Sequence, residues 1–98
     1  MAKKPDLVVE SVRYGVDGKI NLVRAFERRG AMYSDWLLIE RAGLVDLLKQ
    51  GRRVVLGRRK EFMAGTFEAG SPVFLTGSDV IATRKDAQTD ILEGAPFF

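Results

Sequence analysis

The chain of 98 residues contains no cysteine and no histidine. Without cysteine it can form no disulfide, no thiolate metal site and no cysteine nucleophile. Without histidine it lacks the side chain that most often acts as a general base or as a metal ligand. These two absences exclude most classes of enzyme and of metalloprotein. We therefore expect a protein that is not an enzyme and that uses neither a metal nor a cofactor.

Long apolar segments are also missing. The longest segment without a charged residue covers ten residues, 69–78, and it includes two glycines and a proline. A membrane-spanning helix needs about 20 mostly apolar residues. Near the N-terminus the apolar run is limited to residues 7–9, which is too short for the core of a signal peptide. We therefore expect a soluble, cytoplasmic protein without a membrane partner.

The first third of the chain has the alternating pattern of a β-hairpin. Residues 7–14 and 19–28 resemble strands, and Gly18 ends the segment between them. A three-residue turn with Gly18 in the left-handed conformation gives cross-strand pairs of matching type, which stabilise a hairpin. A two-residue turn breaks these pairs up. The predicted pairs are Tyr14–Ile20, Val12–Leu22, Glu10–Arg24 and Val8–Phe26.

A third strand over residues 32–40 extends the same pattern after a turn at Gly30. Its predicted register places Asp35 opposite Arg24, so that Arg24 lies between Asp35 and Glu10. We interpret these three residues as a structural ion network; the alternative is that Arg24 anchors an anionic ligand. The predicted apolar face of the three strands contains Val8, Val12, Tyr14, Ile20, Leu22, Phe26, Tyr33, Leu37 and Ile39.

A short helix is predicted around Leu44, Leu47 and Leu48, because their spacing creates one apolar face. Gly51 is well placed to end this helix. Strand-like patterns return after it, over residues 53–58, 62–68, 72–76 and 79–84.

The resulting order, β-β-β-α-β-β-β, predicts an α+β fold. Its sheet is expected to be small, strongly bent and mostly antiparallel, or to form a partly open β-barrel, with one short covering helix. The chain is long enough for one hydrophobic core, so we expect a single domain over residues 1–98. Within it, residues 1–6 are expected to form a loose N-terminal arm and residues 85–98 a loosely held C-terminal tail.

Charge is distributed unevenly along the chain. Residues 24–60 have a net charge of +6, whereas residues 61–98 have a net charge of −4. Arginine binds phosphate through two parallel hydrogen bonds, and clusters of arginine fall at the ends of the expected elements. We predict that these clusters form a continuous surface that binds a polyanion. The predicted binding residues are Arg28, Arg29, Arg52, Arg53, Arg58, Arg59 and Lys60.

These observations favour a small binding module that uses a basic surface, with nucleic acid or an acidic protein as its partner. No motif of a known nucleic-acid module is present: the chain has no RNP aromatic motif, no helix-turn-helix pair and no zinc-ligand spacing. The alternative is a self-associating structural or accessory domain. Such a domain would form a homo-oligomer through an open strand edge or through the tail that ends in Phe97 and Phe98.

Overall fold

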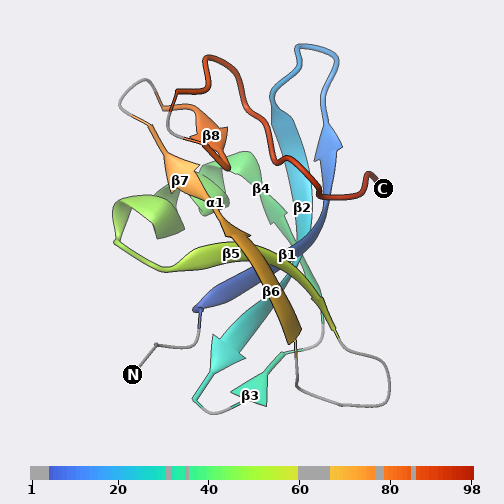
Figure 1. Cartoon of the computed structure of the whole chain (residues 1–98), viewed down its shortest axis with the longest axis vertical. Coiled ribbons are helices and arrows are strands. Elements are labelled where there is room, and N and C mark those ends of the chain that lie inside the picture. The colour runs from blue at the N-terminus through green and yellow to red at the C-terminus, as the bar shows by residue number, and fades with distance from the viewer. Residues whose placement is uncertain (1–4, 31, 35, 60–66, 77–78, 85) are drawn as a thin grey trace.

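The computed structural model describes residues 5–30, 32–34, 36–59, 67–76, 79–84 and 86–98, with only the main chain for residues 59 and 67–69. In this part of the chain, a strongly curled sheet forms half of a barrel and one short helix covers it (Figure 1). The elements are β1 (Leu7–Tyr14), β2 (Ile20–Arg29), β3 (Met32–Tyr33), β4 (Leu37–Glu40), α1 (Arg41–Lys49), β5 (Val54–Arg59), β6 (Phe67–Pro72), β7 (Phe74–Leu75) and β8 (Ile81–Ala82).

The main sheet is mixed, with the strand order β3-β2-β1-β5-β6 and with β4 also paired to β2. β1 and β5 run parallel, whereas the other pairs of this sheet are antiparallel. Parallel strands cannot be joined by a tight turn, and here the chain returns to β1 through β2, β4 and α1. β7 and β8 form a separate two-stranded sheet. The predicted α+β fold with a bent sheet and a short helix is confirmed.

The β1–β2 hairpin has the predicted turn and the predicted ends, but its middle differs. Gly18 has a φ of +80°, the left-handed conformation that a glycine adopts without strain. The predicted pairs Tyr14–Ile20 and Val8–Phe26 are present. The predicted pairs Val12–Leu22 and Glu10–Arg24 are wrong: Arg13 lies opposite Leu22, Val12 opposite Val23, and Ser11 opposite Arg24.

Two β-bulges of opposite sense explain this register. β2 has one extra residue between Ile20 and Leu22, and β1 has one extra residue, Glu10, between Val9 and Ser11. The first bulge shifts the pairing by one residue and the second restores it. The bulge in β1 allows Val9 and Val12, which are three residues apart, to face the same core. In a regular strand, residues three apart point to opposite faces.

The predicted third strand is also wrong in register. The segment forms two short strands, and in β4 it is Leu38, not Asp35, that pairs with Arg24. Asp35 itself lies outside the described residues. The predicted apolar face is divided, because Val8 and Phe26 belong to a small cluster with Val55 that is separate from the main core.

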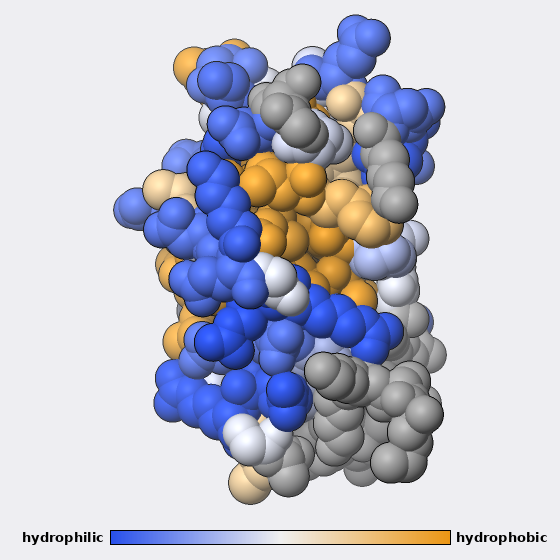
Figure 2. Space-filling view, turned by 90° about the vertical axis from the view of Figure 1, so that its left-hand side faces the viewer, coloured by the Kyte–Doolittle hydropathy of each residue, from blue (hydrophilic) through white to orange (hydrophobic). Residues whose placement is uncertain are grey.

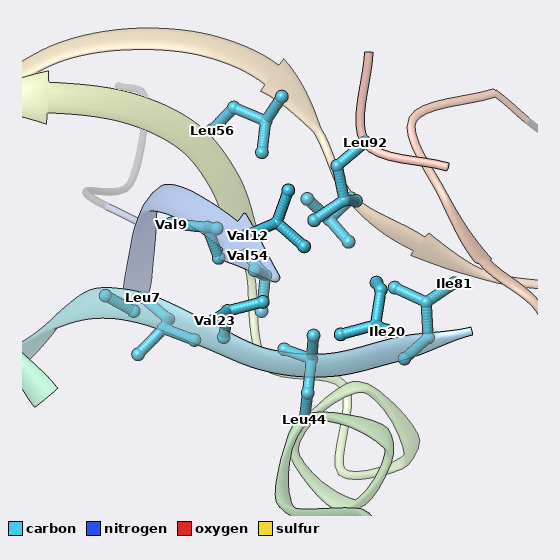
Figure 3. Packing of buried hydrophobic residues seen from close by; sticks show 12 residues of the cluster. Leu7, Val9, Val12, Ile20, Val23, Leu44, Val54, Leu56, Ile81 and Leu92 are labelled. Carbon is cyan, nitrogen blue, oxygen red and sulfur yellow. The ribbon is translucent and has the colours of Figure 1, made fainter. Parts of the chain in front are cut away.

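The main core lies between the curled sheet, α1 and the C-terminal segment (Figure 3). Leu44 reaches from α1 into this core and is fully buried. The helix ends as predicted: Gly51 has a φ of +79° and donates a hydrogen bond to the Leu48 carbonyl, while Arg52 donates one to the Leu47 carbonyl. The core cluster consists of Leu7, Val9, Val12, Ile20, Val23, Ala25, Leu44, Val54, Leu56, Val73, Ile81 and Leu92.

The C-terminal segment, residues 86–98, is held by the core, in contrast to the loose tail expected from the sequence. Leu92 is 3% exposed, and its N–H donates a hydrogen bond of 2.9 Å to the Tyr14 hydroxyl. Phe97 forms a parallel bridge with Val12 of β1. The sequence signals missed this arrangement because a single buried leucine and single bridges create no periodic pattern.

Asp90 is the polar centre of these contacts. Its carboxylate accepts hydrogen bonds from the Ile20 N–H (2.9 Å), from the Ile81 N–H (3.0 Å) and from Arg41 through Nε (2.7 Å) and Nη2 (3.0 Å). The Asp90 side chain is only 2% exposed. Burial acts to raise the pKa of Asp90, but the hydrogen bonds from Arg41, Ile20 and Ile81 outweigh it and hold the pKa below its ordinary value. Asp90 therefore ties β2, β8 and α1 to the C-terminal segment.

We expect Asp90→Ala to lower the free energy of unfolding by about 3–5 kcal/mol, because it leaves two buried N–H groups and the Arg41 guanidinium without their acceptor. Urea denaturation followed by circular dichroism measures this loss. Asp86→Ala is the matched control, since its carboxylate is 86% exposed and contacts Arg84 at 3.7 Å. The control should change the free energy of unfolding by less than about 1 kcal/mol. Equal effects of the two variants would contradict the role of Asp90.

The lowered pKa of Asp90 also predicts acid sensitivity. A carboxylate with a lowered pKa stabilises the folded state above its ordinary pKa of 3.8, and this contribution is lost as the pH falls through the folded-state pKa. We expect the difference in stability between the wild type and Asp90→Asn to be full at about pH 6 and to shrink at about pH 2.5. Urea midpoints over this range test the expectation, and a difference that grows on acidification would contradict it.

Candidate functional site

A cleft of about 870 Å³ lies along the open edge of β1. β5 pairs with this edge from Leu7 to Val9, and the C-terminal segment pairs with it at Val12. Glu10 and Ser11 fall between these two partners and line the cleft. The cleft therefore lies where β1 has separated from β5 and has not yet met the C-terminal segment. Clefts that combine apolar walls with a few polar groups are common ligand sites.

The lining of the cleft mixes cations, acids, hydroxyls and aromatic rings. The charged and hydroxyl residues are Glu10, Ser11, Arg24, Arg58, Ser71 and Glu93. Phe97 and Phe98 contribute the rings, and Gly57 and Gly70 contribute main chain. A Cβ atom at Gly70 would lie 3.3 Å from the Leu56 carbonyl oxygen, so glycine allows β5 and β6 to approach closely here.

A ladder of alternating rings and guanidinium groups lies beside the cleft. The Arg24 guanidinium carbon is 4.7 Å from the centre of the Trp36 ring and 4.8 Å from the centre of the Phe98 ring. The Arg13 guanidinium carbon is 4.9 Å from the Phe98 ring, and Arg13 Nε donates a hydrogen bond of 3.1 Å to the Phe98 main-chain oxygen. All three distances lie within the range of cation–π interactions. We call Trp36, Arg24, Phe98 and Arg13 the stacked ladder.

Two buried polar atoms in the cleft wall have no hydrogen-bond partner among the described residues: Ser11 Oγ and Arg24 Nε. The two residues lie directly opposite each other on β1 and β2. Ser11 is only 5% exposed. A buried polar group without a partner is costly, and such groups are rare in folded proteins. Because two such groups lie side by side in one wall of the cleft, we take this position as the polar centre of the candidate site.

The predicted ion network around Arg24 does not include Glu10. No ion pair joins Arg24 to Glu10 in the described part of the chain, and Asp35 lies outside that part. Ser11, not Glu10, lies across from Arg24 because of the β1 bulge. The alternative that the sequence left open, an arginine placed to anchor an anionic ligand, agrees with this geometry.

The predicted arginine clusters fall into two groups. Arg28 forms an ion pair of 3.0 Å with Asp6, and the Arg53 N–H donates to the same carboxylate at 2.9 Å. The hydrogen bonds from Arg53 and then from Arg28 hold the pKa of Asp6 below its ordinary value. Arg52 lines a smaller cleft of about 220 Å³ beside Asp6 and Arg28. The expected loose arm is therefore anchored at Asp6, while residues 1–4 lie outside the described residues.

Arg58 belongs to the other group, because it lines the large cleft together with Arg24. It follows Arg53 by five positions, which corresponds to about 16 Å along an extended chain. Arg29 pairs with Glu27 at 3.3 Å and is not among the cleft residues. The Arg59 side chain and Lys60 lie outside the described residues. Among the predicted arginines that the structure describes, Arg58 thus lines the larger cleft, whereas Arg28, Arg52 and Arg53 lie at or beside the smaller one.

Sequence reasoning missed Ser11 and Arg13 as site residues. The sequence did single out Phe98 as part of an aromatic tail, but it gave no sign of where the tail packs. The signal for Ser11 was the break in alternation between Val9 and Val12, which indicates the bulge.

No group of three or more acidic residues is arranged as a metal site within the described ranges. No helix there has the length and apolar character needed to cross a membrane. Comparison of the chain with protein-family models, with curated proteins and with solved structures finds no match.

We expect Arg24→Met to lower the free energy of unfolding by no more than about 1 kcal/mol, the usual value of exposed cation–π contacts. A loss above about 3 kcal/mol would instead indicate that Arg24 neutralises buried carboxylates. Urea denaturation distinguishes these outcomes. Trp36 is the sole tryptophan, so its fluorescence reports the stacked ladder directly. Arg24→Ala should shift its emission to longer wavelength as the ring loses its cover, whereas Arg52→Ala should leave the emission unchanged.

Proposed function

We propose that this protein is a non-enzymatic binding module that holds a single-stranded nucleic acid along the cleft. The observation that carries the proposal is the stacked ladder beside an open cleft. Proteins that bind single strands combine cations that contact the backbone with aromatic rings that stack on bases. Both kinds of group occur here within one small region.

The exposure of the aromatic rings supports a nucleic acid over an acidic protein. Trp36 is 52% exposed, and Phe97 is 78% exposed with its edge-to-face contact to Tyr14 at 5.6 Å between ring centres. Large rings with this much exposed surface are costly in water, and bases would cover them. An acidic peptide would use the arginines but would leave the rings uncovered.

The acidic side chains limit how many phosphates the cleft can accept. Glu10 and Glu93 line it together with Arg24 and Arg58. A long row of phosphates would therefore meet repulsion as well as attraction. We expect two or three phosphate contacts, which corresponds to a slope of log K against log salt between about −1.4 and −2.1.

Self-association is the second candidate function. It is favoured by exposed apolar side chains at the β3–β4 edge of the sheet, where Met32 is 74% and Leu38 is 53% exposed. Figure 2 also shows hydrophobic residues gathered in a hollow, surrounded by hydrophilic ones, on the face that carries α1. Sedimentation of the free protein distinguishes this candidate, because self-association requires no nucleic acid.

We expect Arg58→Glu to weaken binding of a labelled oligothymidylate of about 15 nucleotides by at least tenfold at low salt. Fluorescence anisotropy measures the affinity, and circular dichroism verifies that the variant is folded. Arg52→Glu is the matched control: it makes the same charge change at an arginine outside the cleft and should weaken binding much less.

Two results would overturn the proposal. One is the absence of any anisotropy change with single strands at micromolar protein and low salt. The other is an equal loss for Arg58→Glu and Arg52→Glu, which would mean that binding depends on overall charge and not on the cleft.

A further inference from the structure

The two unpartnered atoms in the cleft wall are both hydrogen-bond donors aimed at no acceptor of the described chain. Ser11 Oγ carries one O–H group and Arg24 Nε carries one N–H group. The residues face each other across β1 and β2, so the two donors belong to neighbouring side chains. Arg24 Nε can only donate and the Ser11 hydroxyl can donate or accept, so a ligand with acceptor oxygens can satisfy both.

Arg24 is the group of the site that would pair with an anion. It has no ion-pair partner among the described residues, while Glu10 and Glu93 balance the charge of Arg24 and Arg58 in the cleft as a whole. The centres of the Trp36 and Phe98 rings lie 4.7 Å and 4.8 Å from the Arg24 guanidinium carbon and restrict its movement. A guanidinium fixed in this way loses little freedom when it binds, and its fork of donors fits phosphate oxygens.

The burial of Ser11 favours contact with the end of an oligonucleotide over contact with an internal nucleotide. Ser11 is 5% exposed, so a group that reaches its hydroxyl must enter a nearly closed position. An internal phosphodiester is flanked by nucleotides on both sides, whereas a terminal phosphate has three free oxygens and more negative charge. We propose that Ser11 and Arg24 form a subsite for the terminal phosphate monoester of a single-stranded oligonucleotide. This inference rests on the proposed function of the cleft.

The test compares oligothymidylates that are identical except for a 5′-phosphate, a 3′-phosphate or no terminal phosphate. We expect one of the phosphorylated forms to bind the wild type about tenfold more tightly than the unphosphorylated form, as two charge-assisted hydrogen bonds would provide. Ser11→Ala should remove most of this preference, because the terminal phosphate loses its contact with the hydroxyl. Ser71→Ala is the matched control: Ser71 lines the same cleft but is exposed, and its variant should keep the preference.

Stability gives a second readout that does not depend on nucleic acid. Ser11→Ala removes a buried hydroxyl without a partner, so the urea midpoint of the free protein should stay the same or rise. Added thymidine monophosphate should raise the midpoint of the wild type and not that of Ser11→Ala. A fall of the midpoint in free Ser11→Ala would contradict the inference, because it would show that the hydroxyl already has a structural partner.

The outcomes separate the two proposals. Equal binding of all three oligonucleotides overturns the terminal-phosphate subsite and leaves the proposed function intact. Failure of every oligonucleotide to bind overturns both the proposed function and the subsite, because two of the three oligonucleotides carry the terminal phosphate that the subsite is proposed to hold. A preference that persists in Ser11→Ala overturns the inference.

Discussion

The two compensating bulges of the β1–β2 hairpin are the constraint on which the rest of the molecule depends. They keep Val9, Val12 and Ile20 on the core side although the spacing of these residues does not fit a regular strand. The same shift moves Ser11 and Arg24 into register on the opposite side. The same two bulges therefore determine both the packing of the core and the placement of Ser11 and Arg24. In a hairpin without bulges, Val9 and Val12 would point to opposite faces of the sheet, so one of them would leave the core.

The second half of the site depends on a buried carboxylate that does not itself line the cleft. Asp90 holds the C-terminal segment against β2 and β8, and the chain then runs on to Phe98. The Phe98 ring completes the stacked ladder against Arg24 and Arg13. Asp90 thus contributes to the site by position alone. A buried carboxylate that is fully hydrogen-bonded specifies geometry more than it adds stability.

Local chemistry was readable from the sequence, whereas long-range pairing was not. The apolar spacing around Leu44 and the position of Gly51 predicted the helix and its end, and Gly18 predicted the hairpin turn, because each depends on neighbouring residues. The predicted register beyond that turn was wrong. The opposite charges of Glu10 and Arg24 suggested a cross-strand pair that the packing of the core does not allow. The partners of the C-terminal segment follow from the packing of the whole chain, which no short pattern contains.

The cleft has one wall from the start of the chain and another from its end. Arg13 and Phe98, which are 85 positions apart, meet there. Contacts of such sequence separation form late, because closing a long loop costs entropy before the contact rewards it. During folding the hairpin and the helix can form first, whereas the cleft is complete only when residues 93–98 have packed against β1. A chain in which these residues have detached would therefore lack one wall of the cleft.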